Sequence, residues 1–332
     1  MGSIQPRGDR RRVNDPETAE SPRRVTVLMG GPDAERPVSL ESGNRVVDAL
    51  REVPEVDVSP LVIDRPTAES LEASLGAIGT DIVFPVLHGP WGEGGGLQRV
   101  LEEIGVPFVG SGSKAAAAAM DKLRTKSLAH EAGVPTPPAC LIGDDGSIDL
   151  EAPFVIKPTD EGSSVGVRLI LDAAEAADAI AELRSTHPAL MAERYVAGRE
   201  LTVTVLEGEA MPTVEIEPSD GFYDYEAKYV RGDTRYTVSP SLPAGVESRL
   251  ASHSVKIFNA LQCRDLARVD WLLEDGEGGA TGMEPRIWML EVNTIPGMTT
   301  HSLAPMAAAA RGIDLPDLCR RMVSVAFARA TR

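Results

Sequence analysis

Short apolar runs alternate with stretches of helical periodicity in the first third of the chain. The runs are rich in aliphatic and β-branched residues, and they predict three strands, at residues 25–29, 56–63 and 81–87. Helices are predicted after the first two strands, one with Ser39 or Ser42 as its N-cap and one over residues 68–78. Strands that alternate with helices predict a doubly wound parallel sheet, so this part of the chain is expected to form an α/β domain.

Beyond residue 110 the order of the predicted elements becomes mixed, which indicates an α+β arrangement. Helices are predicted at residues 115–132, 173–183, 248–261 and 315–328, and strands at 154–157, 167–170, 201–206, 213–216 and 236–238. The pattern changes at Gly110-Ser111-Gly112, so we place a domain boundary there. We predict a disordered tail at residues 1–23 and three domains, at residues 24–110, 111–196 and 197–332.

Charge and composition exclude several classes of protein. The 332 residues carry a formal net charge of −17, whereas a nucleic-acid surface needs a broad field of Lys and Arg to displace counterions. The three cysteines share no metal-ligand spacing, which indicates a reducing compartment and no structural zinc. No apolar run approaches the roughly 20 residues that span a bilayer, and the Arg-rich start lacks the apolar core of a signal peptide. We therefore expect a cytoplasmic protein with no nucleic-acid or membrane partner.

Two short polar motifs near the C-terminus have the spacing of a metal site. Residues two apart in a strand share a face, so Arg268 and Asp270 are expected on one face, as are Glu291 and Asn293. The acidic, Gly-rich stretch at residues 274–284 is typical of a hairpin connection, which would pair the two strands antiparallel. Carboxylate and amide oxygens of this kind suit Mg²⁺. The alternative is a salt-bridged strand pair on a solvated face.

Two loops could bind or cover a ligand. Lys157 ends an apolar run, and the Gly/Ser-rich loop at residues 161–166 could then bring backbone N–H groups to an anion, although it is not a Walker A loop. The alternative is a hairpin turn after a lysine whose stem lies along apolar surface. Residues 222–229 hold three of the five tyrosines, which favours a ligand-covering loop over a hairpin with tyrosines at its tip. Gly30-Gly31 lacks the GxGxxG spacing of a dinucleotide site.

Taken in chain order, seven segments resemble the motifs of the D-alanine:D-alanine ligase family. They are GGPDAERPVSL at residues 30–40, LHGPWGEGGGLQ at 87–98, MDK at 120–122, KPTDEGSSVG at 157–166, YDYEAKY at 223–229, RVD at 268–270 and EVNTIPGMT at 291–299. The resemblance covers about residues 24–330. Each motif alone would be weak, whereas seven in the same order are specific.

The resemblance implies an ATP-grasp fold with a Rossmann-like N-terminal substrate domain, a small central domain and a C-terminal catalytic domain with a mixed sheet. ATP and Mg²⁺ would be held between the last two domains. The implied contacts to ATP come from Lys122, Lys157, Ser163, Ser164 and Lys228 at the phosphates and from Glu193, Val196 and Glu200 at the adenosine. Two Mg²⁺ ions, with Mn²⁺ as an alternative, would be bound by Asp270, Glu291 and Asn293.

The implied reaction joins two D-alanines and supplies peptidoglycan precursor synthesis. The first carboxylate attacks the γ-phosphate of ATP, and the second amine attacks the resulting acyl phosphate, so metals and lysines must offset the repulsion between two anions. Arg268 and the backbone N–H of Gly297 would stabilise the oxyanion of the tetrahedral intermediate. The implied substrate contacts are Glu35 at the first ammonium with Ser163 and Tyr229 beside it, His88 near the first D-alanine, and Ser302 and Leu303 near the second.

Tyr229 bears on the second substrate, because a tyrosine here accompanies dipeptide formation in the family and a phenylalanine accompanies D-lactate. The alternatives are a ligase that uses D-serine or D-lactate, a nucleotide-binding protein without catalysis, and a Rossmann-type dinucleotide-binding module. The family also implies a homodimer. Three positions depart from the family pattern: Pro37 stands where Glu is usual, Gly94 where Asp is usual, and Arg194-Tyr195 where Lys-Trp is common.

Overall fold

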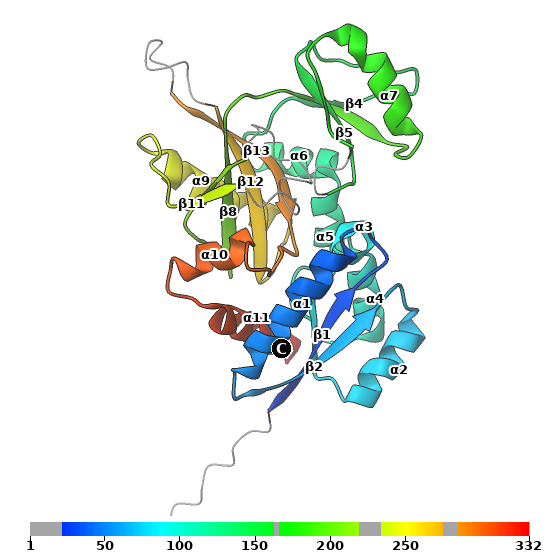
Figure 1. The fold of residues 1–332 in the computed structure, drawn as a ribbon, viewed down its shortest axis with the longest axis vertical. Coiled ribbons are helices and arrows are strands. Elements are labelled where there is room, and N and C mark those ends of the chain that lie inside the picture. Colours follow the sequence, from blue (N-terminus) through cyan, green and yellow to red (C-terminus); the bar gives the residue numbers. More distant parts are fainter. Residues whose placement is uncertain (1–21, 163–165, 219–233, 275–283, 332) are drawn as a thin grey trace, which may run out of the picture.

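The computed structural model describes residues 22–162, 166–218, 234–274 and 284–331, and within those ranges its strands form three sheets (Figure 1). The first sheet lies at the bottom of Figure 1 in blue and cyan, and a green sheet with α7 lies at the upper right. The third sheet lies beside them and carries the orange C-terminal strands. Residues 1–21 of the predicted tail, the whole predicted tyrosine loop at 222–229 and residues 275–283 of the hairpin connection lie outside the described residues.

The first sheet is parallel, with strand order β2-β1-β3, and helices cover both of its faces. Its elements are β1 (Arg23–Gly30), α1 (Arg36–Arg51), β2 (Val56–Ile63), α2 (Ala68–Ile78), β3 (Ile82–Pro85), α3 (Gly89–Gly92) and α4 (Gly96–Ile104). Alternate residues of β1 point to opposite faces. Val27 and Met29 join the core shared with α1, whereas Leu28 joins the core shared with α2 and α4. The predicted doubly wound arrangement is therefore confirmed.

The expected N-cap of α1 is wrong. The helix begins at Arg36 with Pro37 in its first turn, a position where the missing N–H of proline is no loss. Ser39 and Ser42 lie inside the helix and connect it to other segments instead. Ser39 Oγ accepts from Gly30 N at 2.9 Å and donates to Val86 O at 2.7 Å, and Ser42 Oγ accepts from Met298 N at 3.0 Å. Both serines thus fix the start of α1 against loops that line the site.

The second sheet is antiparallel, with strand order β4-β7-β5-β6. The elements of this part are α5 (Ser113–Met120), α6 (Lys122–Glu131), β4 (Ala139–Leu141), β5 (Phe154–Pro158), β6 (Arg168–Ile170), η1 (Ala173–Glu175), α7 (Ala176–Arg184) and β7 (Leu190–Arg194). The single helix predicted at 115–132 is wrong, because Asp121 is extended and caps α6 by accepting from Arg124 N at 3.0 Å. This break places Lys122 at the start of α6.

The third sheet has the strand order β11-β10-β8-β12-β13, with β9 paired to β8. Its strands are β8 (Arg199–Leu206), β9 (Glu209–Ala210), β10 (Val214–Glu217), β11 (Arg235–Val238), β12 (Leu266–Glu274) and β13 (Arg286–Asn293). The helices of this part are α9 (Val246–Ala260), α10 (Leu303–Ala309) and α11 (Leu315–Ala330). β12 and β13 pair antiparallel, which confirms the predicted pairing of the two polar motifs.

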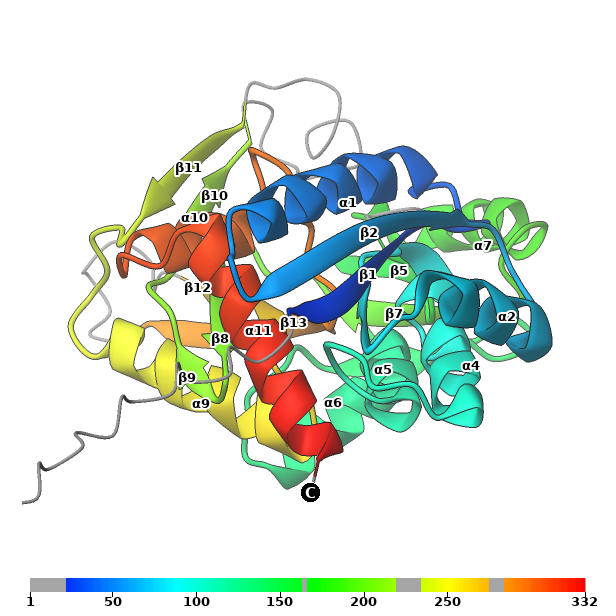
Figure 2. The same cartoon turned by 90° about the horizontal axis from the view of Figure 1, so that it is seen from below.

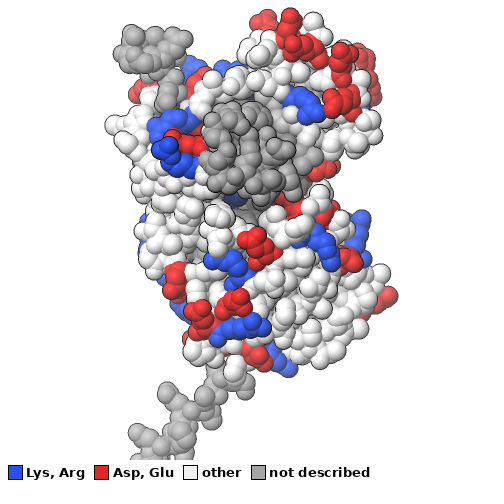
Figure 3. Space-filling view, viewed as in Figure 1, with Lys and Arg blue, Asp and Glu red and all other residues white. Residues whose placement is uncertain are grey.

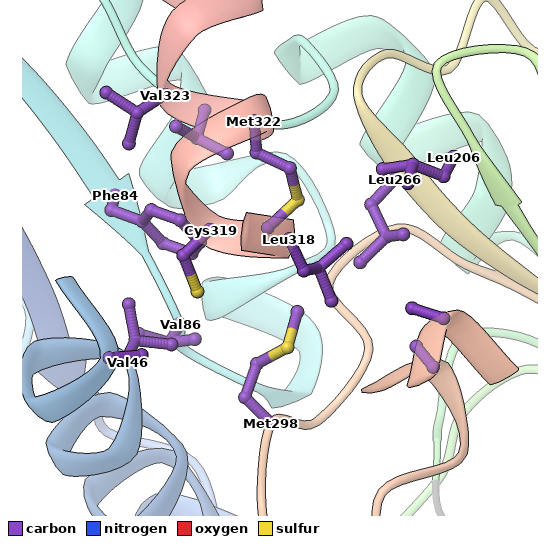
Figure 4. Close-up of a cluster of buried hydrophobic side chains, with 14 of the residues drawn as sticks. Val46, Phe84, Val86, Leu206, Leu266, Met298, Leu318, Cys319, Met322 and Val323 are labelled. Atoms are coloured by element: carbon purple, nitrogen blue, oxygen red, sulfur yellow. The ribbon is translucent and has the colours of Figure 1, made fainter. Parts of the chain in front are cut away.

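The C-terminal helix connects the first sheet to the third. Figure 2 shows α11 between β1 and β2 on one side and α9 on the other, and α11 packs against both α1 and β3. Figure 4 shows Phe84, Met298 and Met322 in the shared apolar cluster, in which Leu318 is fully buried. Burial of this cluster stabilises the relative position of the two sheets. The proposed division at residues 24–110, 111–196 and 197–332 stays a prediction.

Acidic side chains gather on the lobe that carries α7 (Figure 3). In this segment Asp172, Glu175, Asp178 and Glu182 are all exposed. None of the helices in the described part of the chain combines the length and the apolar character that crossing a bilayer requires.

Candidate active site

Two adjoining cavities open where the three sheets meet. The first cavity is lined by Glu35, His88, Glu93, Arg268, Asn293, Gly297, Ser302 and Leu303, among others. The second cavity is lined by Lys157, Glu193, Val196, Glu200, Asp270 and their neighbours, and it encloses about 390 Å³, a size usual for small-molecule sites. Lys122, Glu161 and Glu291 line both cavities. A ligand in one cavity can therefore approach a ligand in the other at these three residues.

The β12–β13 pair provides a charged wall between the cavities. In the register, Arg268 lies opposite Asn293 and Asp270 lies opposite Glu291. Arg268 forms a fork with Asp270, with Nε 2.9 Å from Oδ1 and Nη2 2.8 Å from Oδ2. Thr202 Oγ1 of β8 donates to Asp270 Oδ1 at 2.7 Å. The side chains of Arg268 and Asp270 are only 16% and 8% exposed, so the alternative of a salt bridge on a solvated face is wrong.

The oxygen atoms of this wall fit a hard divalent cation. Asp270 and Glu291 supply carboxylates from neighbouring strands, and Asn293 adds a carboxamide two residues after Glu291. Mg²⁺ usually takes one or two protein carboxylates and completes its shell with phosphates and water. Within the described ranges no three His, Cys, Asp or Glu side chains form a group that could hold a metal ion without other ligands. Asn293 Oδ1 also accepts from Ile295 N at 2.9 Å, so its orientation is fixed.

Two lysines line the second cavity, Lys122 from α6 and Lys157 from β5, and Lys126 of α6 lies behind it. Lys122 Nζ lies 3.7 Å from Glu291 Oε2 and also donates to Glu161 O. Lys157 Nζ donates to Glu193 Oε1 at 2.6 Å, and Lys126 forms an ion pair with the other oxygen of Glu193. Lys157 is thus buried against a carboxylate. The alternative, in which its stem lies along apolar surface with the ammonium group in water, is wrong. Burial opposes ionisation of Glu193, but the two ammonium groups outweigh it and hold its pKa below the ordinary value.

The first cavity contains a buried His/Glu pair. His88 follows β3 and Glu93 follows α3, and both are buried. His88 Nδ1 lies 3.9 Å from Glu93 Oε2, too far for a hydrogen bond, and His88 Nε2 has no hydrogen-bond partner among the described residues. Burial raises the pKa of Glu93, and the attraction of His88 opposes this only in part. A buried polar group without a partner is costly unless something occupies the space beside it, so a polar ligand next to His88 would be stabilised.

The loop after β13 closes the other side of the first cavity. Ser302 Oγ accepts from Thr299 N at 2.9 Å and lies 2.9 Å from Thr299 Oγ1. A Cβ at Gly297 would lie 2.8 Å from Ser302 Oγ, so only glycine fits without moving that serine. Leu303 begins α10 and is buried. Gly297, Ser302 and Leu303 are therefore brought together at the cavity, as expected.

The structure places most of the predicted site residues at the two cavities. Those that line them are Glu35, His88, Lys122, Lys157, Glu193, Val196, Glu200, Arg268, Asp270, Glu291, Asn293, Gly297, Ser302 and Leu303. Ser163, Ser164, Lys228 and Tyr229 lie outside the described residues. The roles assigned to all of these residues stay predictions.

Among the residues at the site that were not predicted, three carry buried or partly buried charges. Lys126 lies four residues after Lys122, the spacing of one helical turn, which is the only local signal of its position. Glu93 and Glu161 lie in segments quoted for the resemblance, but nothing in the sequence indicated that they would be withdrawn from water. Burial raises the pKa of Glu161.

The three departures from the family pattern have local explanations. Pro37 lies in the first turn of α1, where proline is favoured. A Cβ at Gly94 would lie 2.2 Å from Pro90 O, so this loop conformation requires glycine. The guanidinium of Arg194 lies over the ring of Trp288, 4.6 Å from its centre.

Glu93→Gln is expected to gain stability over the wild type as the pH rises. The folded pKa of Glu93 lies above its unfolded value of about 4.5, so the folded protein holds this proton more tightly. The resulting stabilisation is fully present below the unfolded pKa and is lost as the pH rises through the folded pKa. Urea unfolding at about pH 5 and about pH 8 measures the difference in free energy of unfolding between variant and wild type. Glu103→Gln, at an exposed position of α4, is the matched control; a difference for Glu93→Gln that does not grow with pH contradicts the prediction.

Comparison with known proteins agrees with this geometry. The family model described as D-ala D-ala ligase C-terminus matches residues 145–324, and the one described as D-ala D-ala ligase N-terminus matches residues 66–111. A D-alanine–D-alanine ligase of Methylacidiphilum infernorum is 39% identical over 312 residues, which cover 93% of this chain and 97% of the relative. D-alanine–D-alanine ligase B of Chromobacterium violaceum is 42% identical over 309 residues, which cover 90% of this chain and 96% of the relative.

Solved structures show the same architecture. The crystal structure of a D-alanine–D-alanine ligase from Bacillus anthracis complexed with ATP superposes with a TM-score of 0.79 at 28% identity, and the match covers 94% of this chain and 99% of that one. The C-terminal family model alone matches more than half of the chain, and the Methylacidiphilum infernorum relative covers 93% of it. The chain therefore belongs to the D-alanine–D-alanine ligase family and has the ATP-grasp fold.

Proposed function

We propose that the protein joins two D-alanine molecules to D-alanyl-D-alanine with the cleavage of ATP to ADP and phosphate, through an acyl phosphate, as a cytoplasmic step of peptidoglycan precursor synthesis. The observation that carries the proposal is the charged wall of β12 and β13. There Arg268, Asp270 and Glu291 lie between a cavity suited to small substrates and a larger cavity that reaches Lys157. Family membership and the ATP complex of the neighbouring ligase support the same reaction.

The second cavity is the proposed ATP site. Lys122 and Lys157 would contact the phosphates, because both ammonium groups line this cavity and are held by carboxylate or carbonyl oxygens. Glu193, Val196 and Glu200 would line the adenosine. Ser163, Ser164 and Lys228 are proposed as further phosphate contacts on the strength of the sequence motif alone.

Asp270, Glu291 and Asn293 would hold two Mg²⁺ ions, with Mn²⁺ as an alternative, and a bound cation there would offset the negative charge of the phosphates. Arg268 acts beside them. Its guanidinium is held in the plane of Asp270 by two hydrogen bonds, so it is oriented before any substrate arrives. A preoriented donor of this kind stabilises an oxyanion without reorganisation during the reaction. The backbone N–H of Gly297 is the proposed second donor.

The first cavity is the proposed D-alanine site. The Glu35 carboxylate would bind the ammonium of the first D-alanine, with Ser163 and Tyr229 beside it, and His88 would lie near the same substrate. Ser302 and Leu303 would contact the second D-alanine. The first carboxylate forms a bond to the γ-phosphorus while the bond to ADP breaks, and the second amine then displaces phosphate from the carbonyl carbon.

A phosphate-release assay with the purified protein tests this proposal. Release is expected to require D-alanine, ATP and Mg²⁺ together and to be accompanied by equimolar dipeptide. Faster release with D-alanine plus D-lactate or D-serine would move the assignment to a ligase for that second substrate. Phosphate release that is independent of D-alanine, or turnover with a nicotinamide cofactor in place of ATP, would contradict it.

A homodimer is proposed from the family resemblance, and light scattering of the purified protein measures it.

A further inference from the structure

Lys126 occupies a buried position behind the second cavity. Its side chain is 8% exposed, although lysine is almost never fully buried without a partner. Its ammonium group forms an ion pair with Glu193, donates to Thr136 Oγ1, and donates to Pro137 O with an N–O distance of 3.1 Å. Two of the three N–H donors of the ammonium group are thus used by Thr136 and Pro137, and its charge lies against the Glu193 carboxylate. The turn that follows α6 thus holds this charge in one place.

Glu193 of β7 lies between two ammonium groups from different elements. Lys157 of β5 donates to Oε1 at 2.6 Å, and Lys126 of α6 faces Oε2. Glu193 and Lys157 line the second cavity, whereas Lys126 is not among its lining residues. Lys126 therefore approaches the carboxylate from the side away from the cavity.

The net charge of Lys126, Glu193 and Lys157 determines the electrostatic potential that a ligand meets at Lys157. A buried pair of Lys157 and Glu193 alone would be neutral, and a phosphate group would meet a lysine whose charge was already balanced. With Lys126 added, one carboxylate and two ammonium groups carry a net positive charge. Charges separated by a few ångströms interact strongly where water is excluded, so the second ammonium group changes the potential at the cavity wall.

We propose that Lys126 is a positioning residue for ATP: it fixes Glu193 and balances its charge, so that Lys157 presents a net positive charge to the phosphate groups. This inference rests on the proposed ATP-dependent function. Lys126 contacts no substrate and acts through Glu193 and Lys157. Burial of Lys126 makes its charged form less favourable, and this is reflected in its pKa. Burial lowers the pKa of Lys126 to about 8, Glu193 opposes the shift, and Lys157 and Lys122 add to it.

Lys126→Gln is the most direct test, because glutamine can still donate to Thr136 and Pro137 but carries no charge. Its dissociation constant for ATP, measured by calorimetry without D-alanine, is expected to rise about tenfold, the size of one charge-assisted hydrogen bond. The KM for D-alanine at saturating ATP is expected to stay unchanged. Lys126→Arg should restore most of the ATP affinity. Lys256→Gln, at an exposed position of α9, is the matched control.

A double variant separates action through Glu193 from a general effect on packing. In a Glu193→Gln background, Lys126→Gln is expected to weaken ATP binding much less than it does in the wild type, because the charge that Lys126 balances is gone. Equal effects in both backgrounds would overturn the proposal. Unchanged ATP affinity in folded Lys126→Gln would do so as well, as would equal rises in the KM for ATP and the KM for D-alanine.

The pH dependence of ATP affinity, compared between the wild type and Lys126→Arg, tests the proposal even if Lys126→Gln does not fold. ATP affinity of the wild type is expected to fall above about pH 8 as Lys126 loses its proton, and that of Lys126→Arg to fall less, because arginine stays charged. The charged groups that face Lys126 are Glu193 from β7, Lys157 from β5 and Lys122 from its own helix, and they are the same in both proteins. Identical profiles would overturn the proposal. ATP-dependent turnover of the wild type tests the proposed function separately.

Discussion

Arg268→Ala is expected to lower kcat by roughly 10²-fold or more, because the loss of one preoriented oxyanion donor typically has an effect of that size. The variant also leaves Asp270 without the guanidinium that holds both of its oxygens, while the Thr202 hydroxyl still donates to it. Steady-state phosphate release at saturating ATP and D-alanine measures the effect. The KM for ATP is expected to change less than kcat, because Arg268 lines the first cavity and not the second.

Two controls accompany the Arg268 variant. Arg268→Lys keeps the positive charge but cannot form the bidentate hydrogen bond to Asp270, so it is expected to recover only part of the rate. Arg320→Ala removes an arginine that pairs with Asp317 on the surface of α11, and it should leave turnover unchanged. Near-normal kcat in Arg268→Ala would remove Arg268 from the proposed role.

Glu291→Gln is expected to raise the Mg²⁺ concentration for half-maximal activity at least tenfold and to lower kcat. Replacement of groups that only support a metal ligand typically weakens metal binding by about 10-fold to 100-fold, and Glu291 is proposed as a ligand itself. The substitution keeps the shape of the side chain and removes the charge that faces Asp270 and Lys122. Mg²⁺ titrations of turnover measure the shift, and Mn²⁺ binding in the presence of ATP, followed by calorimetry, gives a readout that does not depend on activity.

Glu69→Gln, at an exposed position of α2, is the matched control for Glu291→Gln and should leave the Mg²⁺ dependence unchanged. If Glu291→Gln bound Mn²⁺ as the wild type does, the metal site would have to lie elsewhere. A loss of kcat with unaltered Mn²⁺ binding would instead assign Glu291 to the orientation of Lys122.

Local pattern was enough to predict many elements. The bounds of β2 and α2 coincide with the predicted ranges 56–63 and 68–78, because each apolar pattern ends at residues that terminate its element. Thr67 caps the start of α2, and Gly79 ends the helix in a left-handed conformation. Threonine and glycine are common at these two positions. The shared face of Arg268 and Asp270 followed from the two-residue repeat of a strand, and their hydrogen bonds confirm it.

Other features depend on contacts that no local pattern contains. The strand β7 was not predicted, since its short run gains its strand partners only from β4 and β5. The helical pattern from residue 115 continues through Asp121, yet the capping side chain breaks it into two helices. Lys126 and Glu193 are far apart in sequence, so their ion pair follows only from the packing of α6 against the second sheet.

The same limit applies to Ser39 and Ser42. Their positions near the start of a helix suggested caps, because serine is common there. In the folded chain Ser39 bonds instead to the end of β1 and to the loop after β3, which the first sheet brings together. Ser42 bonds to the loop after β13, which becomes its neighbour only when the first and third sheets pack together.

Oxygen transfer from substrate to phosphate tests the central claim most directly. D-alanine labelled with oxygen-18 in its carboxylate is turned over with unlabelled ATP, and the phosphate is analysed by mass spectrometry or ³¹P NMR. If the charged wall of β12 and β13 drives the carboxylate onto the γ-phosphate, each phosphate released will contain a single labelled oxygen, because the C–O bond breaks when the second amine attacks. Phosphate without label, formed together with the dipeptide, would contradict the acyl phosphate and the account built on it.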